Sequence, residues 1–296
     1  MAPLLLAVPN VSEGRDAARI AALESAFAEG VSLLDRHSDA DHNRTVFTLA
    51  GTAAALAEAL ARGAGAAIEL IDMDKHEGAH PAIGALDVSP LVWLAPAERE
   101  AAEAAAAATA DAIAALGVPV FFYGAMATGP DHVERAYFRN GGLAELWLRM
   151  EAGELRPDRG PGLPHRTGGA TLVTARPPLG AFNVELDSGD LEAAQAVAAG
   201  LRESGGGLAG VRAIGLPLAS GRTQVSTNIH DPGGVPLGEV VERVRALAAP
   251  LGARPLEGEL IGLIPAAALD GYPRDVPLRD FDPARQTIER RLAALA

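Results

Sequence analysis

The strongest constraint on the fold of this 296-residue chain is an order of predicted elements that occurs twice. Alternating apolar residues and turn residues predict strands, and apolar residues at helical spacing predict helices. Both halves show the order strand, helix, strand, strand, helix, strand, which is that of a ferredoxin-like unit. The elements span 4–8, 15–28, 31–35, 45–49, 53–70 and 88–94, and then 182–186, 191–203, 211–218, 224–229, 237–251 and 259–264.

This repeat predicts an α/β protein of the α+β type, with two ferredoxin-like βαββαβ lobes, mixed or antiparallel sheets and helices mainly on one face. A further helix and strand are expected over 98–123. The lobes divide near 176–179, so the predicted domains span 1–177 and 178–296. By composition alone, the Pro- and Gly-rich stretch 156–169 forms a linker between the lobes, or a wall of a ligand cleft there.

Composition narrows the classes of ligand and location. The net charge of −13 argues against nucleic acid or an anionic membrane as the main partner. The absence of cysteine excludes disulfides, thiolate metal sites and a cysteine nucleophile. No apolar run reaches the roughly 18–20 residues of a spanning helix, and no basic region precedes the first apolar segment as in a secretory signal. We therefore expect a cytoplasmic protein that binds small molecules.

Polar residues of the first half gather in three loops, at 9–14, 35–45 and 72–81. Histidine is the side chain best suited to proton transfer near neutral pH. The last two loops contain four of the seven histidines, which are His37, His42, His76 and His80. These loops are therefore the predicted location of a catalytic site.

Structural roles compete with catalysis in these loops. Ser12 could cap the helix predicted at 15–28, as Asp190 could cap the one at 191–203. Asn43 could simply begin a strand. Two aspartates, Asp39 and Asp41, would then only solvate a hairpin.

A metal site is a further alternative. His76 and His80 lie four residues apart, and four other side chains could complete a site with them. Gly78 and Pro81 disfavour the helix on which two histidines at this spacing share a face in zinc proteases. A metal-dependent hydrolase is thus the weakest alternative. Its other candidate ligands are His37, Asp39, Asp41 and His42.

Seven segments, in the same order along the chain, resemble those of glutamate formimidoyltransferases. Together they extend over nearly the whole chain and match the transferase part alone, without a cyclodeaminase domain. The segments are Val-Pro-Asn-Val-Ser-Glu-Gly at 8–14, His-Asn-Arg-Thr-Val-Phe-Thr at 42–48, Ile-Asp-Met at 71–73 before the histidine-rich loop, Gly-Ala-Leu-Asp-Val at 84–88, Ala-Arg-Pro-Pro-Leu-Gly-Ala-Phe-Asn-Val at 175–184, Gln-Val-Ser-Thr-Asn at 224–228 and Leu-Ile-Gly-Leu-Ile-Pro at 260–265.

The resemblance implies a two-lobed homodimer that moves a formimidoyl group from N-formimidoyl-L-glutamate to N5 of tetrahydrofolate, without a metal. The family's catalytic histidine lies in a Gly-Glu-His-Pro-Arg-like segment that aligns with 78–82, which assigns the general acid/base role to His80. The folate-contacting segment aligns with Gly160, Pro161, Gly162, Leu163, Pro164, His165, Arg166, Thr167, Gly168 and Gly169. Local cations for an anionic folate are then His165, Arg166 and Arg176.

This reaction matches the chemistry of a neutral histidine. The attacking N5 amine must lose a proton and the departing glutamate nitrogen must gain one. An imidazole can accept the first and donate the second. Candidate substrate-binding residues, as hydrogen-bond donors or carboxylate anchors, are Asn10, Asn43 and Arg44.

Three positions depart from the family pattern. Ala79 stands where relatives carry Glu, Ala82 where they carry Arg, and His37 where an acidic residue occurs. Loss of an arginine removes a bidentate carboxylate ligand. The donor, formimidoyl- or formylglutamate, therefore stays open. A second alternative is a non-catalytic folate-binding homologue.

Overall fold

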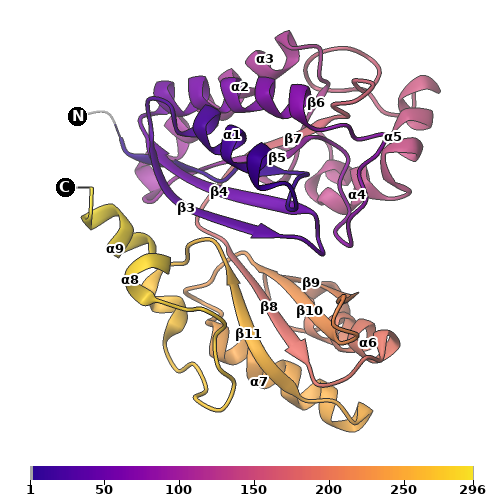
Figure 1. Cartoon of the computed structure of the whole chain (residues 1–296), viewed down its shortest axis with the longest axis vertical. Helices are drawn as coiled ribbons and strands as arrows, with labels where there is room; N and C mark the ends of the chain where they lie inside the picture. The colour runs from indigo at the N-terminus through magenta and orange to yellow at the C-terminus, as the bar shows by residue number, and fades with distance from the viewer. Residues whose placement is uncertain (1–2, 296) are drawn as a thin grey trace. The chain divides into compact units, whose positions relative to one another are not determined.

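The computed structural model describes residues 3–295. The chain divides into two compact units, Met1–Pro177 and Pro178–Ala296. Each unit has its own sheet, as the colours in Figure 1 show. Within 3–295 no helix combines the length and the apolar character that crossing a membrane requires.

The second unit is a ferredoxin-like βαββαβ fold. Its four strands form an antiparallel sheet in the order β11-β8-β10-β9. Helices α6 and α7 cover one face and enclose a core of buried aliphatic residues and Phe182. Its elements are β8 (Gly180–Leu186), α6 (Leu191–Leu201), β9 (Val211–Pro217), β10 (Thr223–Ile229), α7 (Leu237–Ala248), β11 (Pro255–Ile261), α8 (Pro283–Gln286) and α9 (Ile288–Ala293).

The first unit contains the same order of elements and extends it. Strand β4 and strand β5 both pair antiparallel with β1 and β2, and β3 pairs with β4. Beyond β5 the sheet continues with β7 and then β6, which are parallel to it. The elements are β1 (Leu5–Ala7), β2 (Asn10–Val11), α1 (Ala17–Ala28), β3 (Ser32–Asp39), β4 (Arg44–Gly51), α2 (Ala53–Leu70), β5 (Leu86–Val92), α3 (Arg99–Ala115), β6 (Val120–Phe122), α4 (Arg135–Arg139), α5 (Gly142–Glu151) and β7 (Thr171–Arg176).

Helices α1, α2 and α3 cover one face of this sheet and bury its main core (Figure 1). Phe27 of α1 packs where α2 has Gly63, since a Cβ there would lie 2.0 Å from the Phe27 ring. Helices α4 and α5 contribute Phe138 and Leu146 to a smaller core with Phe121 and Leu172. The predicted α+β class with mixed and antiparallel sheets is therefore confirmed, and this smaller core adds helices beyond the predicted repeat.

Several local predictions need correction. Ser12 does not cap a helix: α1 begins at Ala17 with Asp16 as its N-cap, whereas the predicted Asp190 cap of α6 is present. Strand β7 was not expected. It lies between β5 and β6 and is buried at nearly every position, so it lacks the alternation that identifies half-exposed strands.

Candidate active site

The three polar loops of the first unit meet at Asn43. The Gly14 amide donates to the Asn43 side-chain oxygen over 2.9 Å, and the Asn43 amide group donates to the Glu77 carbonyl over 3.0 Å. The Ala79 amide also donates to the Asp41 carbonyl over 3.0 Å. Asn43 has a φ of 48°, a left-handed conformation that asparagine tolerates better than most residues. Asn43 thus holds the loops together, which is a role that its sequence context did not predict.

Glycine at position 78 permits the close approach of the third loop to the second. A Cβ there would lie 2.3 Å from the His42 carbonyl oxygen. We expect Gly78→Ala to lower the free energy of unfolding by about 1–3 kcal/mol, as overpacking does, and to lower activity by moving His80. The matched control is Gly129→Ala, because a Cβ at Gly129 meets nothing within 4 Å. Equal unfolding free energies for the two variants, measured in urea, would contradict this close packing.

His80 has the hydrogen bond of a general base in this loop. Its Nδ1 lies 2.9 Å from the Pro81 carbonyl oxygen. A carbonyl only accepts, so the proton of a neutral ring is on Nδ1 and the lone pair is on Nε2. The residue is half-buried, and its ring stands edge-on to the His42 ring with 6.0 Å between centroids.

Burial and nearby positive charge keep this imidazole neutral. Burial is the main cause that lowers the pKa of His80 well below its usual value, and Arg44, Arg139 and Arg135 lower that pKa further. The neutral form therefore prevails at neutral pH, which is the form that can accept a proton.

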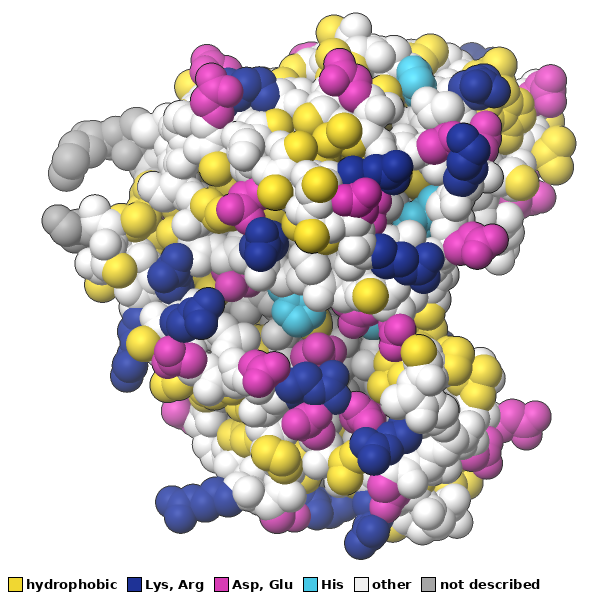
Figure 2. Space-filling view, in the orientation of Figure 1, with side chains coloured by type: hydrophobic (Ala, Val, Ile, Leu, Met, Phe, Trp, Pro, Cys, Tyr) yellow, Lys and Arg dark blue, Asp and Glu magenta, His cyan; other side chains and the backbone are white. Residues whose placement is uncertain are grey.

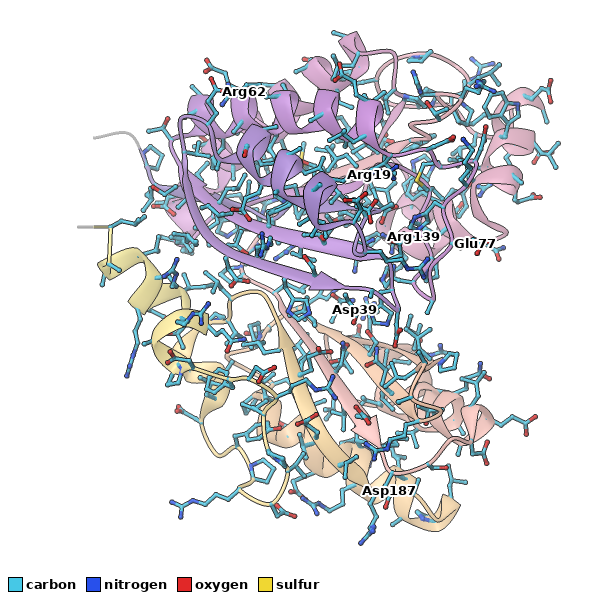
Figure 3. All side chains as sticks on the ribbon, in the orientation of Figure 1. Arg19, Asp39, Arg62, Glu77, Arg139 and Asp187 are labelled. Atoms are coloured by element: carbon cyan, nitrogen blue, oxygen red, sulfur yellow. The ribbon has the colours of Figure 1, made fainter. Side chains whose placement is uncertain are left out.

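The other two histidines beside His80 are differently placed. His76 Nδ1 lies 3.3 Å from the Asn43 amide nitrogen, and burial lowers its pKa. His42 is buried, with its main-chain amide bound to Asp39 at the end of β3 (Figure 3). Within 3–295, His, Asp and Glu side chains form no group of three or more that could hold a metal ion.

A buried ion network lies beside the histidine loop. Asp87 is fully buried and accepts hydrogen bonds from Arg44 over 2.8 Å, from Arg139 and from the Ile83 amide. Arg44 also donates twice to the side-chain oxygen of Asn10, over 2.8 and 3.1 Å. Burial acts to raise the pKa of Asp87, but the two guanidinium groups outweigh it and the pKa is lowered.

Sequence reasoning placed Asn10 and Arg44 in the site but missed Asp87, Arg139 and Arg135. Asp87 lies in the segment 84–88 that resembles the family, but nothing else in the sequence indicated a role for it. Arg135 and Arg139 are the first and last residues of α4. They lie four residues apart, so they share one side of the helix. That spacing is the one signal in the sequence that could have identified them.

The segment 160–169 belongs to the first unit and is not a linker. His165 and Gly169 exchange two main-chain hydrogen bonds of 2.8 Å, which close a tight turn. The turn is attached to the histidine-loop region, because Thr167 accepts from the Met73 amide and Gly168 from the Ala85 amide. A Cβ on Gly169 would lie 2.1 Å from the Ile83 carbonyl oxygen.

The cations expected in this segment differ in their surroundings. His165 Nδ1 accepts a hydrogen bond of 2.9 Å from the Gly168 amide, so the ring shapes the turn as an acceptor. The Arg166 side chain is 82% exposed, and its Nη1 lies 4.0 Å from Oδ2 of Asp74. Of the two, Arg166 is the exposed side chain.

Comparison with known proteins places this chain in a family. Residues 4–176 match the N-terminal subdomain of the formiminotransferase domain, and residues 181–271 match the formiminotransferase domain. The chain belongs to the formiminotransferase domain family.

Its relatives include two proteins named glutamate formimidoyltransferase. The one from Streptococcus pyogenes is 37% identical, with 99% of each chain covered. The one from Thermoplasma acidophilum is 34% identical, with 99% of this chain and 98% of the relative covered. The formimidoyltransferase-cyclodeaminase of Mus musculus is 36% identical over 91% of this chain and 51% of its own length.

Proposed function

We propose that this chain is a one-carbon transferase that moves the formimidoyl group of N-formimidoyl-L-glutamate to N5 of tetrahydrofolate. The observation that carries the proposal is the neutral His80, whose Nδ1–H points to a carbonyl and leaves Nε2 to accept a proton. The two relatives named glutamate formimidoyltransferase, matched over nearly their whole length, supply the reaction class.

The proposed steps conserve atoms and charge. N5 attacks the formimidoyl carbon, a new N5–carbon bond forms and Nε2 of His80 takes the N5 proton. The tetrahedral intermediate then breaks its bond to the glutamate nitrogen, and the imidazolium returns the proton to that nitrogen. Arginine charges near His80 lower its pKa, so the second proton transfer is favourable.

The candidate binding residues take different roles in this proposal. Arg44 uses three N–H contacts on Asn10 and Asp87, which leaves others of its five N–H groups for a substrate carboxylate. Asn10 also donates to the Val8 carbonyl over 2.7 Å. We therefore assign Asn10 and Asn43 to positioning Arg44 and the loops, and Arg44 to the substrate.

An assay with N-formimidoyl-L-glutamate and tetrahydrofolate tests the reaction directly. We expect formation of N5-formimidoyltetrahydrofolate, insensitive to a chelator. Faster turnover of N-formyl-L-glutamate would identify a formyl transferase instead, and tight tetrahydrofolate binding without turnover a non-catalytic homologue. Activity lost to a chelator and restored by a metal would support the hydrolase alternative.

The pH dependence of kcat/KM tests the state of His80. Because its pKa is lowered well below the usual 6.5, the imidazole loses its proton at a lower pH and remains a base from there upward. We expect the acidic limb of kcat/KM to lie well below pH 6.5. A limb at or above pH 6.5 would contradict the neutral His80.

We also propose that 160–169 contacts the folate. Arg166→Glu should then weaken tetrahydrofolate binding about two- to fivefold at low salt, and less at high salt, because the side chain is solvated and screened. Arg156→Glu is the matched control, being an exposed arginine outside the segment. Equal dissociation constants for both variants, by fluorescence titration, would count against this contact.

The proposed assembly is a cytoplasmic homodimer, with tetrahydrofolate as co-substrate and no metal cofactor. Support comes from the sequence resemblance and from the chemistry, in which histidine alone can transfer both protons. The mass in solution from light scattering tests the dimer.

A further inference from the structure

Four arginines of the first unit lie close to one another. Arg44 and Arg139 share Asp87. The guanidinium carbon of Arg135 lies 5.8 Å from the centre of the Tyr123 ring, and Arg176 lies beside the same tyrosine, which partly opposes the lowering of the Arg176 pKa by burial. Arg135 connects the two pairs, since its charge lowers the pKa of both Arg139 and Arg176.

The charges of this arginine group are not balanced by the protein. Asp87 pairs with Arg44 and Arg139, whereas in the described part of the chain no carboxylate forms an ion pair with Arg135 or Arg176. The pKa values of Arg139 and Arg176 are both lowered to about 10. Burial is the main cause, and repulsion from Arg135 lowers both values further. On the face that Figure 2 shows, acidic and basic side chains are interspersed. Like charges gathered with a single carboxylate among them repel one another, so this group is suited to a bound anion.

A second observation also points to a ligand. The Arg139 side chain is 10% exposed, and its Nε is buried without a hydrogen-bond partner among residues 3–295. Buried polar atoms almost always have partners. Arg139 is therefore only partly satisfied by Asp87.

We infer that Arg135, Arg139 and Arg176 bind the carboxylates of a glutamate-type dicarboxylate. This rests on the proposed function, in which both substrates contain a glutamate. The donor is the better occupant, because its carboxylates lie a few bonds from the reacting nitrogen, whereas the folate glutamate is separated from N5 by the aminobenzoyl ring. Arg139 binds Asp87, which also accepts from the amide of Ile83, three residues after His80. The arginines are therefore close to the proposed reacting atoms, in agreement with their lowering of the His80 pKa.

Calorimetric titration with N-formyl-L-glutamate, without tetrahydrofolate, measures this binding independently of turnover. Arg135→Gln and Arg176→Gln should each raise the dissociation constant about 10- to 100-fold, the range for a lost charged hydrogen bond. The matched control is Arg99→Gln, since Arg99 also lies over an aromatic ring, Trp93, but pairs with Glu103 in solvent. Arg99→Gln should leave the dissociation constant unchanged.

Ligand variation tests the same inference without any mutation. Wild-type protein should bind N-formyl-L-glutamine, which has one carboxylate, at least about tenfold more weakly than N-formyl-L-glutamate. Equal affinity of the wild-type protein for these two ligands would overturn the inference. This result does not depend on whether Arg135→Gln and Arg176→Gln fold. A raised dissociation constant for tetrahydrofolate, with that for N-formyl-L-glutamate unchanged, would assign the arginines to the folate glutamate and also overturn it. Intact dicarboxylate binding without formimidoyl transfer would refute the proposed function alone.

Discussion

Replacement of His80 by alanine should lower turnover by about 10²–10⁴, the usual contribution of one general acid–base group. Folding and tetrahydrofolate affinity should change little, because the residue is only half-buried and makes its one described hydrogen bond to the adjacent Pro81 carbonyl. Steady-state kinetics, a tetrahydrofolate titration and the midpoint of thermal unfolding measure these three quantities.

His76→Ala is the matched control for this variant. His76 lies in the same loop, but its ring contacts Asn43, so its loss should affect the loop contacts more than proton transfer. We expect a much smaller fall in kcat for His76→Ala than for His80→Ala. Equal losses accompanied by release of a bound metal would replace the transferase mechanism with a metal site, and unchanged kcat in both variants would move catalysis elsewhere.

Replacement of Asp87 by alanine should lower the free energy of unfolding by about 3–5 kcal/mol, as the loss of one partner of a buried ion pair does. The variant leaves Arg44 and Arg139 buried without their carboxylate. Because the folded-state pKa of Asp87 is lowered, its stabilising contribution is present above the unfolded pKa and is lost as the pH falls through the folded pKa. The difference between wild type and variant in urea unfolding should therefore shrink below about pH 4.

The matched control for Asp87 is Asp187→Ala in the second unit. Asp187, labelled in Figure 3, also pairs with an arginine, Arg254, over 2.9 Å. The Arg254 side chain, however, is largely exposed. Exposed pairs contribute under about 1 kcal/mol. If Asp87→Ala costs no more than Asp187→Ala, the buried network does not stabilise the first unit.

The sequence alone determined the ferredoxin-like order of both units. In the second unit, the predicted strands and helices all occur, with ends that shift by a few residues. Such elements are predictable because they follow from local periodicity and from caps such as Asp190, which lie within a few residues of the structure they define. Family resemblance added His80 and the segment 160–169, which remain proposals.

Only the tertiary structure decided which charges meet. Asp87 joins Arg44 and Arg139, which lie 43 and 52 residues away along the chain. Likewise, the turn at 165–169 is attached to residues 73–85 through main-chain hydrogen bonds, which composition does not reveal. Electrostatic interactions depend on distance in space and on burial, and neither quantity is encoded in local sequence patterns. The pKa of His80 and the arginine group beside it therefore follow from the fold of the first unit.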